Sequence, residues 1–190
     1  MPNLTSHLAF YGYGVAAALF LLIAVLILAS WKGQAKGGLL ALAVVMTALW
    51  SGGLAYSEVS LTVNWSHIYF LELARDTSWL LFLAEVLNRA TGGNLVRIMR
   101  LGGPAIGFAF LGAGLISFAA LTTPASVGSP ELLTLGSLVT SLCVVVYLEQ
   151  IFRNSPREDR KGLKYFCIAT GSIFIYDIVL YSDARVAGHI

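Results

Sequence analysis

The hydrophobic residues of this chain fall into long unbroken runs that are separated by short polar linkers. Each run has about 20 mostly apolar residues, the length that a helix needs to cross a hydrocarbon core of about 30 Å. The runs lack the segments of about 10 residues with alternating polarity that form a membrane barrel. The pattern therefore predicts an all-α fold, a polytopic membrane bundle with six transmembrane helices over residues 10–30, 38–56, 68–87, 101–121, 132–152 and 163–181.

The composition indicates that lipid is the natural solvent of this chain. Hydrophobic residues make up 57% of the sequence and charged residues 12%, with a mean hydropathy of +0.79. About a quarter of the residues in soluble domains are charged, so this chain has too few polar groups to cover a soluble surface. We expect one multi-pass membrane domain over residues 1–190, surrounded by the lipid bilayer and without a soluble domain.

The basic residues gather on one side of the expected bundle. Ten of the twelve Lys and Arg lie in three alternate linkers, "WKGQAKGG", "NRATGGNLVRIMR" and "FRNSPREDRKGLK". The two linkers on the other side, "SEVSLTVNWSH" and "TTPASVGSPE", contain no Lys or Arg. The positive-inside rule then places the three basic linkers in the cytoplasm and the N-terminus outside.

The third hydrophobic run is unusual because it contains charged residues. Glu72, Arg75, Asp76 and Trp79 follow the spacing i, i+3, i+4 and i+7, which places them on one face of a helix. Arg75 and Asp76 lie ~10–12 Å below the outer boundary at a rise of 1.5 Å per residue. Charges at that depth are costly beside lipid, so we expect them to face the bundle interior or a wet cavity.

The last run carries an aspartate at a similar level. Asp177 lies ~6 Å below the same boundary and shares a helical face with Tyr181. Our hypothesis is that Arg75 bridges Asp76 or Glu72 of its own helix to Asp177. Structural pairing, sensing of a ligand or proton, and a transport path all remain open as roles. The candidate polar cluster comprises Glu72, Arg75, Asp76, Trp79, Asp177, Tyr181 and Asp183.

Chemistry-bearing motifs are missing from the sequence. There is no HExxH, no GxSxG, no phosphate-binding glycine loop and no cluster of metal-ligand residues. Cys143 and Cys167 lie inside apolar runs, where packing is their expected role. We therefore expect no catalytic residue, no metal, no cofactor and no nucleic-acid partner for these 190 residues.

Two local patterns predict further details of the helices. Gly103 and Gly107 form a GxxxG spacing, which permits close helix approach either within one bundle or between two chains. Pro156, followed by acidic residues, predicts the start of a helix at that position.

Two segments resemble a known family. They are "LELARDTSWLLFL" and "YLEQIFRNSPREDRKGLKYFCIATGSIFIYDIVLYSDA", and they are similar to the N-terminal membrane region of the PrsK family, the sensor histidine kinases of the PEP-CTERM/exosortase system. The matching positions are Glu72, Arg75, Asp76, Trp79, Glu149, Gln150, Arg153, Asn154, Pro156, Arg160, Lys164, Cys167, Tyr176, Asp177, Tyr181, Ser182 and Asp183.

The resemblance implies a role in signal input. Family members sit in the bacterial inner membrane and continue into further spans, a GAF-like domain and a kinase domain, so we expect this chain to be part of a longer protein. ATP and Mg²⁺ would belong only to that kinase domain. Its partner would be a cytoplasmic response regulator that controls exopolysaccharide and exosortase-linked genes, and homodimerisation stays open. The alternatives are a small transporter or channel, and a membrane scaffold of polysaccharide assembly.

Overall fold

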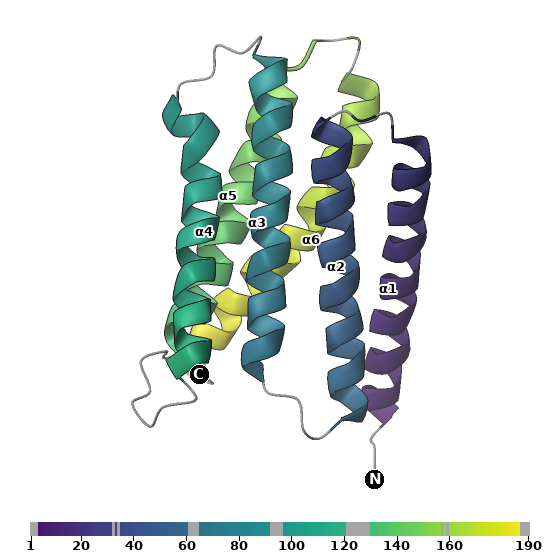
Figure 1. The fold of residues 1–190 in the computed structure, drawn as a ribbon, viewed down its shortest axis with the longest axis vertical. Helices are drawn as coiled ribbons and strands as arrows, with labels where there is room; N and C mark the ends of the chain where they lie inside the picture. The colour runs from purple at the N-terminus through teal and green to yellow at the C-terminus, as the bar shows by residue number, and fades with distance from the viewer. Residues whose placement is uncertain are drawn as a thin grey trace.

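The computed structural model describes residues 4–31, 33, 35–60, 65–91, 97–120, 130–156, 158 and 160–186, with side chains except at 4–6, 35–36, 65–66, 97–100, 114–120, 130–133 and 184–186. Within these residues the chain forms six helices and no strand (Figure 1), which confirms the all-α prediction. Each expected run coincides with one helix, apart from residue 121, which lies outside the described residues. The helices are α1 (Leu4–Ser30), α2 (Ala35–Val59), α3 (Trp65–Ala90), α4 (Arg97–Ala120), α5 (Pro130–Asn154) and α6 (Arg160–Val186).

Four of these helices are long and apolar enough to cross a membrane. The qualifying segments belong to α1, α2, α5 and α6. Helix α3 has a similar length, 26 residues, but it carries charged residues of the polar cluster. In α4 the apolar stretch with described side chains, Leu101–Ala113, is shorter than a full span. The structure thus contains several candidate membrane-spanning helices, as expected, and the six-span topology stays a prediction.

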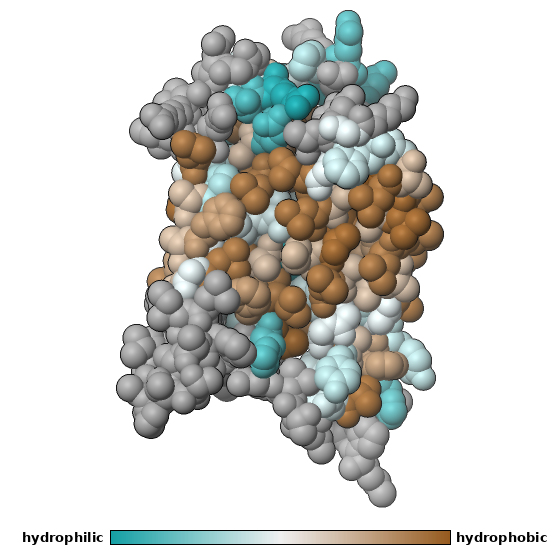
Figure 2. All heavy atoms as spheres, viewed as in Figure 1, coloured by the Kyte–Doolittle hydropathy of each residue, from teal (hydrophilic) through white to brown (hydrophobic). Residues whose placement is uncertain are grey.

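The distribution of side chains is the reverse of that in a soluble protein. Leu19, Leu22 and Leu26 of α1 are each more than half exposed, whereas Arg75 and Asp76 are completely buried. Figure 2 shows apolar residues across the middle of the visible face, with hydrophilic ones nearer its two ends. Large exposed apolar surfaces mark contact with a membrane or a partner, so this surface suits a bundle that is solvated by lipid.

Helix α3 occupies the centre of the bundle. It packs against α2, α4 and α5, while α1 packs against α2, and α6 packs against α5 (Figure 1). The backbones of α3 and α6 do not come into contact along the described parts of these helices. Long side chains fill the space between them, and this space contains the candidate site.

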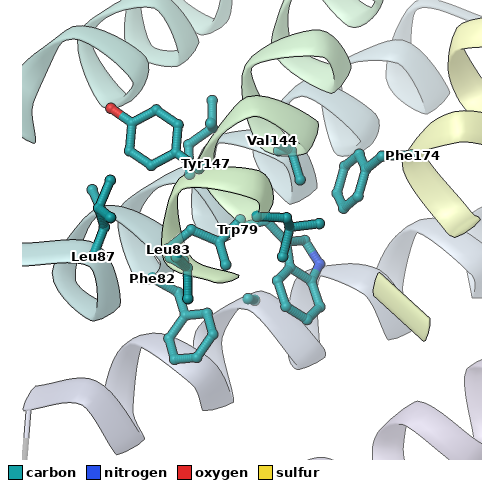
Figure 3. Packing of buried hydrophobic residues seen from close by; sticks show 12 residues of the cluster. Trp79, Phe82, Leu83, Leu87, Val144, Tyr147 and Phe174 are labelled. Carbon is teal, nitrogen blue, oxygen red and sulfur yellow. The ribbon is translucent and has the colours of Figure 1, made fainter. Parts of the chain in front are cut away.

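The apolar core lies in the half of the bundle that faces the basic linkers. Leu83 and Leu87 of α3 pack there with Val144 of α5, and all three are buried (Figure 3). The ring of Trp79 meets Phe82 edge to face at 6.0 Å and Phe174 of α6 at 6.3 Å. In lipid such contacts stabilise mainly by close packing, because exposed side chains are already in an apolar medium.

Helix α4 approaches its neighbours through glycines. A Cβ at Gly107 would lie 2.7 Å from Oγ1 of Thr77 on α3, and one at Gly103 would lie 2.7 Å from the ring of Tyr147 on α5. The hydroxyl of Tyr147 also accepts a hydrogen bond from the backbone N–H of Gly103 at 3.1 Å. The GxxxG spacing therefore serves packing within this bundle.

Candidate functional site

Arg75 is the centre of the polar cluster between α3 and α6. Its side chain is completely buried. Nε and Nη2 donate to Oδ1 of Asp76 at 3.0 and 2.8 Å, and Nη2 also donates to Oδ2 of Asp177 at 2.6 Å. Asp177 belongs to α6, so one guanidinium joins α6 to α3. Charge-assisted hydrogen bonds of this kind are shorter and stronger than those between neutral groups.

Two further helices contribute to the surroundings of Arg75. Thr140 of α5 donates from Oγ1 to Oδ2 of Asp76 at 2.8 Å. The ring of Trp50 on α2 lies 4.1 Å from Cζ of Arg75, a cation–π distance. Phe174 of α6 lies 5.4 Å from the same atom. Side chains of α2, α3, α5 and α6 therefore meet around Arg75 and its partner Asp76.

A second polar contact joins α3 to α6 farther from the basic linkers than the first, toward the end of the bundle that the topology predicts to be outer. Tyr181 donates its hydroxyl to Oε1 of Glu72, and both side chains are buried. Glu72 precedes Arg75 by three residues, and Tyr181 follows Asp177 by four, so the two contacts lie about one helical turn apart. We call Glu72, Arg75, Asp177 and Tyr181 together the α3–α6 bridge.

Carboxyl groups outnumber cations in the described part of the cluster. One guanidinium faces three carboxyl groups, since Oε1 of Glu72 lies 4.0 Å from Nη2 of Arg75 in addition to the two aspartates. Nη1 of Arg75 has no hydrogen-bond partner among the described residues. No group of three or more His, Cys, Asp or Glu in the described part of the chain is arranged to hold a metal ion. The chemistry of the site is therefore that of an ion-pair network.

Trp79 marks the inner limit of the polar cluster. Its Nε1 donates to Oγ1 of Thr47 on α2 at 3.1 Å, and Thr47 in turn donates to the carbonyl of Ala43 at 2.8 Å. Beyond this point, on the side of the basic linkers, the space is occupied by the rings of Phe82 and Phe166, which lie 6.1 Å apart. The cluster is thus closed on that side by aromatic side chains.

The structure brings most of the sequence-derived cluster together. Glu72, Arg75, Asp76, Asp177 and Tyr181 form one network, and Trp79 lies at its inner edge. Asp183 does not join them, because its side chain is exposed near the end of α6. The alternation of helical faces explains this difference, since Asp183 is six residues from Asp177 and points away from it.

Three residues of the site were not expected from the sequence. Trp50, Thr140 and Phe174 surround Arg75 or Asp76 but come from three different helices. A threonine inside an apolar run is a weak signal for a polar partner. Nothing in the local sequence distinguishes Trp50 or Phe174 from other packing aromatics.

A second group of residues from the resembling segments was expected on the cytoplasmic side, and its described members lie around the connection between α5 and α6. This group, the cytoplasmic motif, comprises Glu149, Gln150, Arg153, Asn154, Pro156, Arg160 and Lys164. Arg160 donates from Nε to the carbonyl of Ser155 at 3.0 Å and from Nη2 to that of Arg153 at 3.2 Å. A basic side chain on the last carbonyls of a helix stabilises its C-terminus. The expected helix start at Pro156 is wrong, because α6 begins at Arg160 and Pro156 lies exposed between the helices.

The other motif residues make contacts within their own helices or remain at the surface. Glu149 pairs with Arg153 at 3.4 Å, with both side chains more than half exposed. Asn154 donates to the carbonyl of Gln150 at 2.7 Å, and Lys164 is exposed on α6. Exposed pairs contribute about 0–1 kcal/mol, so this motif fixes the end of α5 rather than a chemical site.

Comparisons with known proteins do not identify the chain. No protein-family model, no curated protein and no solved structure matches it. The function therefore has to be argued from the site and from the arrangement of the helices.

Proposed function

We propose that this chain is the membrane-embedded signal-input region of a two-component sensor histidine kinase of the PrsK type, placed in a bacterial inner membrane with six spans and its N-terminus outside. In this proposal a kinase domain elsewhere in the protein uses ATP and Mg²⁺ and phosphorylates a cytoplasmic response regulator. The response regulator controls genes of exopolysaccharide synthesis and of exosortase-linked surface proteins.

The α3–α6 bridge is the observation that carries this proposal. Its two contacts join helices whose backbones do not touch, so side chains alone connect α6 to α3, and the polar ones lie in the half away from the aromatic contacts of Phe82 and Phe166. Buried charges inside a membrane bundle are costly, and they commonly mark functional sites. A helix that is held in this way suits a switch, because a small change in charge pairing alters its position.

In the proposed mechanism the two contacts report the condition of the outer half of the membrane. We call the state with both contacts formed closed and the state with them broken open. A signal that binds the open state more tightly shifts the population toward it, by an amount set by the difference in affinity. Loss of the Glu72–Tyr181 contact frees the outer end of α6, and loss of the Arg75–Asp177 contact frees the helix at a deeper level. The kinase would read the resulting displacement of α6.

The closed inner side of the cluster favours this proposal over a transporter or channel. A transport path requires polar groups that continue from the cluster to the cytoplasm. The hydrophobic cluster below Trp79 is tightly packed, with Leu83 and Val144 at 0% exposure. Of the deeper polar residues, Thr47 and Thr140 already have hydrogen bonds to Trp79 and Asp76. Ser141 is buried without a partner among the described residues, and the side chain of Ser117 lies outside the described part. No feature of the described surface favours a scaffold over a sensor.

The proposal is tested by the coding sequence and by phosphorylation. The gene should continue beyond the codon of Ile190 into a phospho-accepting histidine and an ATP-binding domain. Full-length protein in liposomes should autophosphorylate at a rate that changes in Asp177→Asn and in Tyr181→Phe, while Asp183→Asn, outside the bridge, behaves as wild type. A stop codon directly after Ile190, or equal rates in all four proteins, would contradict the proposal.

A further inference from the structure

Helices α5 and α6 enclose an apolar groove on the side of the basic linkers. Its volume is about 540 Å³, and its walls include Leu148 and Phe152 of α5 and Cys167, Gly171 and Ile175 of α6. The polar hydroxyl of Ser172 in its wall is satisfied by the carbonyl of Ala169 at 2.9 Å. The groove therefore presents a hydrocarbon surface along its length.

The charged residues of the groove lie at one end. Lys164 belongs to the second turn of α6, and Glu149 lies near the end of α5. Glu149 is paired with Arg153 of its own helix at 3.4 Å. Within the described residues Lys164 has no such pair, so its ammonium group is free to meet a ligand at the mouth of the groove.

The dimensions of the groove match one leaflet of a bilayer. Lys164 and Ile175 are eleven positions apart on α6, which corresponds to about 16 Å along a helix. Half of a hydrocarbon core of about 30 Å has nearly the same depth. The groove thus reaches from the cytoplasmic boundary, where anionic lipids gather, to the middle of the membrane.

We propose that this groove binds one acyl chain of an anionic phospholipid of the inner leaflet, with the headgroup phosphate on Lys164. The length of the groove, its apolar walls and the lysine at its end all suit a lipid. This site shares no residue with the α3–α6 bridge, so it does not depend on a sensor role, and it rests on the proposed function only for the orientation of the bundle.

Gly171 provides the sharpest test of the groove. A Cβ at this position would lie 3.7 Å from Cδ1 of Leu148, which is ordinary contact, and a larger side chain built on that Cβ would extend into the groove. Gly171→Leu therefore fills the space that the acyl chain would take. Gly112→Leu is the matched control, because a Cβ at Gly112 meets nothing within 4 Å.

The experiment uses the full chain in liposomes with phosphatidylglycerol or phosphatidylcholine that carries a photoactivatable acyl chain. We expect labelling to concentrate on residues 145–152 and 164–175, with phosphatidylglycerol preferred. Gly171→Leu should lose this labelling, and Gly112→Leu should retain it. Lys164→Gln should lower the preference for phosphatidylglycerol about fivefold, the effect of one basic side chain beside an anionic surface.

Several results would overturn the proposal. Equal labelling of all six helices, equal labelling by both lipids, or undiminished labelling in Gly171→Leu would each mean that ordinary surrounding lipid has been captured. Cross-links between two copies of the chain at this groove, in place of lipid adducts, would assign the surface to self-association. Circular dichroism and gel filtration of each variant ensure that only folded protein is compared.

Discussion

Nη2 of Arg75 lies 2.6 Å from Oδ2 of Asp177, although the two residues are 102 positions apart and the backbones of their helices do not touch. The same nitrogen lies 2.8 Å from Asp76, so the guanidinium serves a partner on its own helix and one on α6 at once. This geometry makes the effect of each partner on stability dependent on the others.

The pairing of Arg75 predicts that the effect of Asp177→Asn changes sign with the background. In the wild type the change removes a charged hydrogen bond and should cost about 1.5–3 kcal/mol of unfolding free energy. Arg75→Leu should cost about 3–5 kcal/mol, because it leaves buried carboxylates without their cation. In the Arg75→Leu background Asp177→Asn should stabilise, since it neutralises one of these carboxylates.

Unfolding in mixed detergent micelles measures the unfolding free energies of the wild type, Asp177→Asn, Arg75→Leu and the double variant. If Arg75→Leu does not survive purification, the yield of folded protein is compared instead. Arg89→Ala is the control. Arg89 pairs with Glu85 at 2.7 Å but is half exposed, so its loss should cost less than about 1 kcal/mol. Equal destabilisation by Asp177→Asn in both backgrounds would show that the two residues act independently.

The outer contact of the bridge predicts a local movement of α6. Tyr181→Phe removes the hydroxyl that donates to Glu72 while keeping the ring. The outer end of α6 should then sample a wider range of distances from α2, with little change in the inner half. Double electron–electron resonance between spin labels at Tyr56 and Ser182, both exposed, measures this distribution of distances. An unchanged distribution would mean that packing alone holds the end of α6.

The hydrogen bond between Trp79 and Thr47 predicts a small, shared contribution to stability. Thr47→Val keeps the shape of the side chain but leaves the indole N–H without its acceptor at 3.1 Å. Hydrogen bonds between membrane helices contribute about 0.6 kcal/mol on average and at most about 1.7. Thr47→Val should fall in this range, and it should have almost no effect once Trp79→Phe has removed the donor. Additive losses in the double variant would argue against the bond.

The sequence predicts the helices and the partners on each helix better than it predicts the site as a whole. Six apolar runs are enough to locate the helices, because each must satisfy its own backbone hydrogen bonds. The spacing of Glu72, Arg75 and Asp76 reveals their common face. Asp177 is suggested as a partner only because it lies at a similar depth in the last apolar run. Trp50 and Thr140 could not be found in this way, because their contact with the cluster depends on how the helices are rotated and ordered around α3.

The glycines of α4 predict the strongest effect of a single added side chain. Gly107→Leu places a Cβ 2.7 Å from Oγ1 of Thr77, next to Asp76, and Thr77 cannot move easily because its hydroxyl is bonded to the carbonyl of Leu73 at 2.7 Å. Overpacking of this kind costs about 1–3 kcal/mol or more. Because α4 would be pushed away from α3, we expect lower folded yield and a lower midpoint in thermal unfolding.

The matched variant Gly112→Leu adds the same side chain to the same helix, where nothing lies within 4 Å. It should fold and unfold like the wild type. Gly107→Ala gives an intermediate case, since a single methyl group already meets the hydroxyl of Thr77. If Gly107→Leu folded normally but abolished association of two chains, the GxxxG spacing would serve a dimer interface, and the close contact of α4 with α3 would be contradicted.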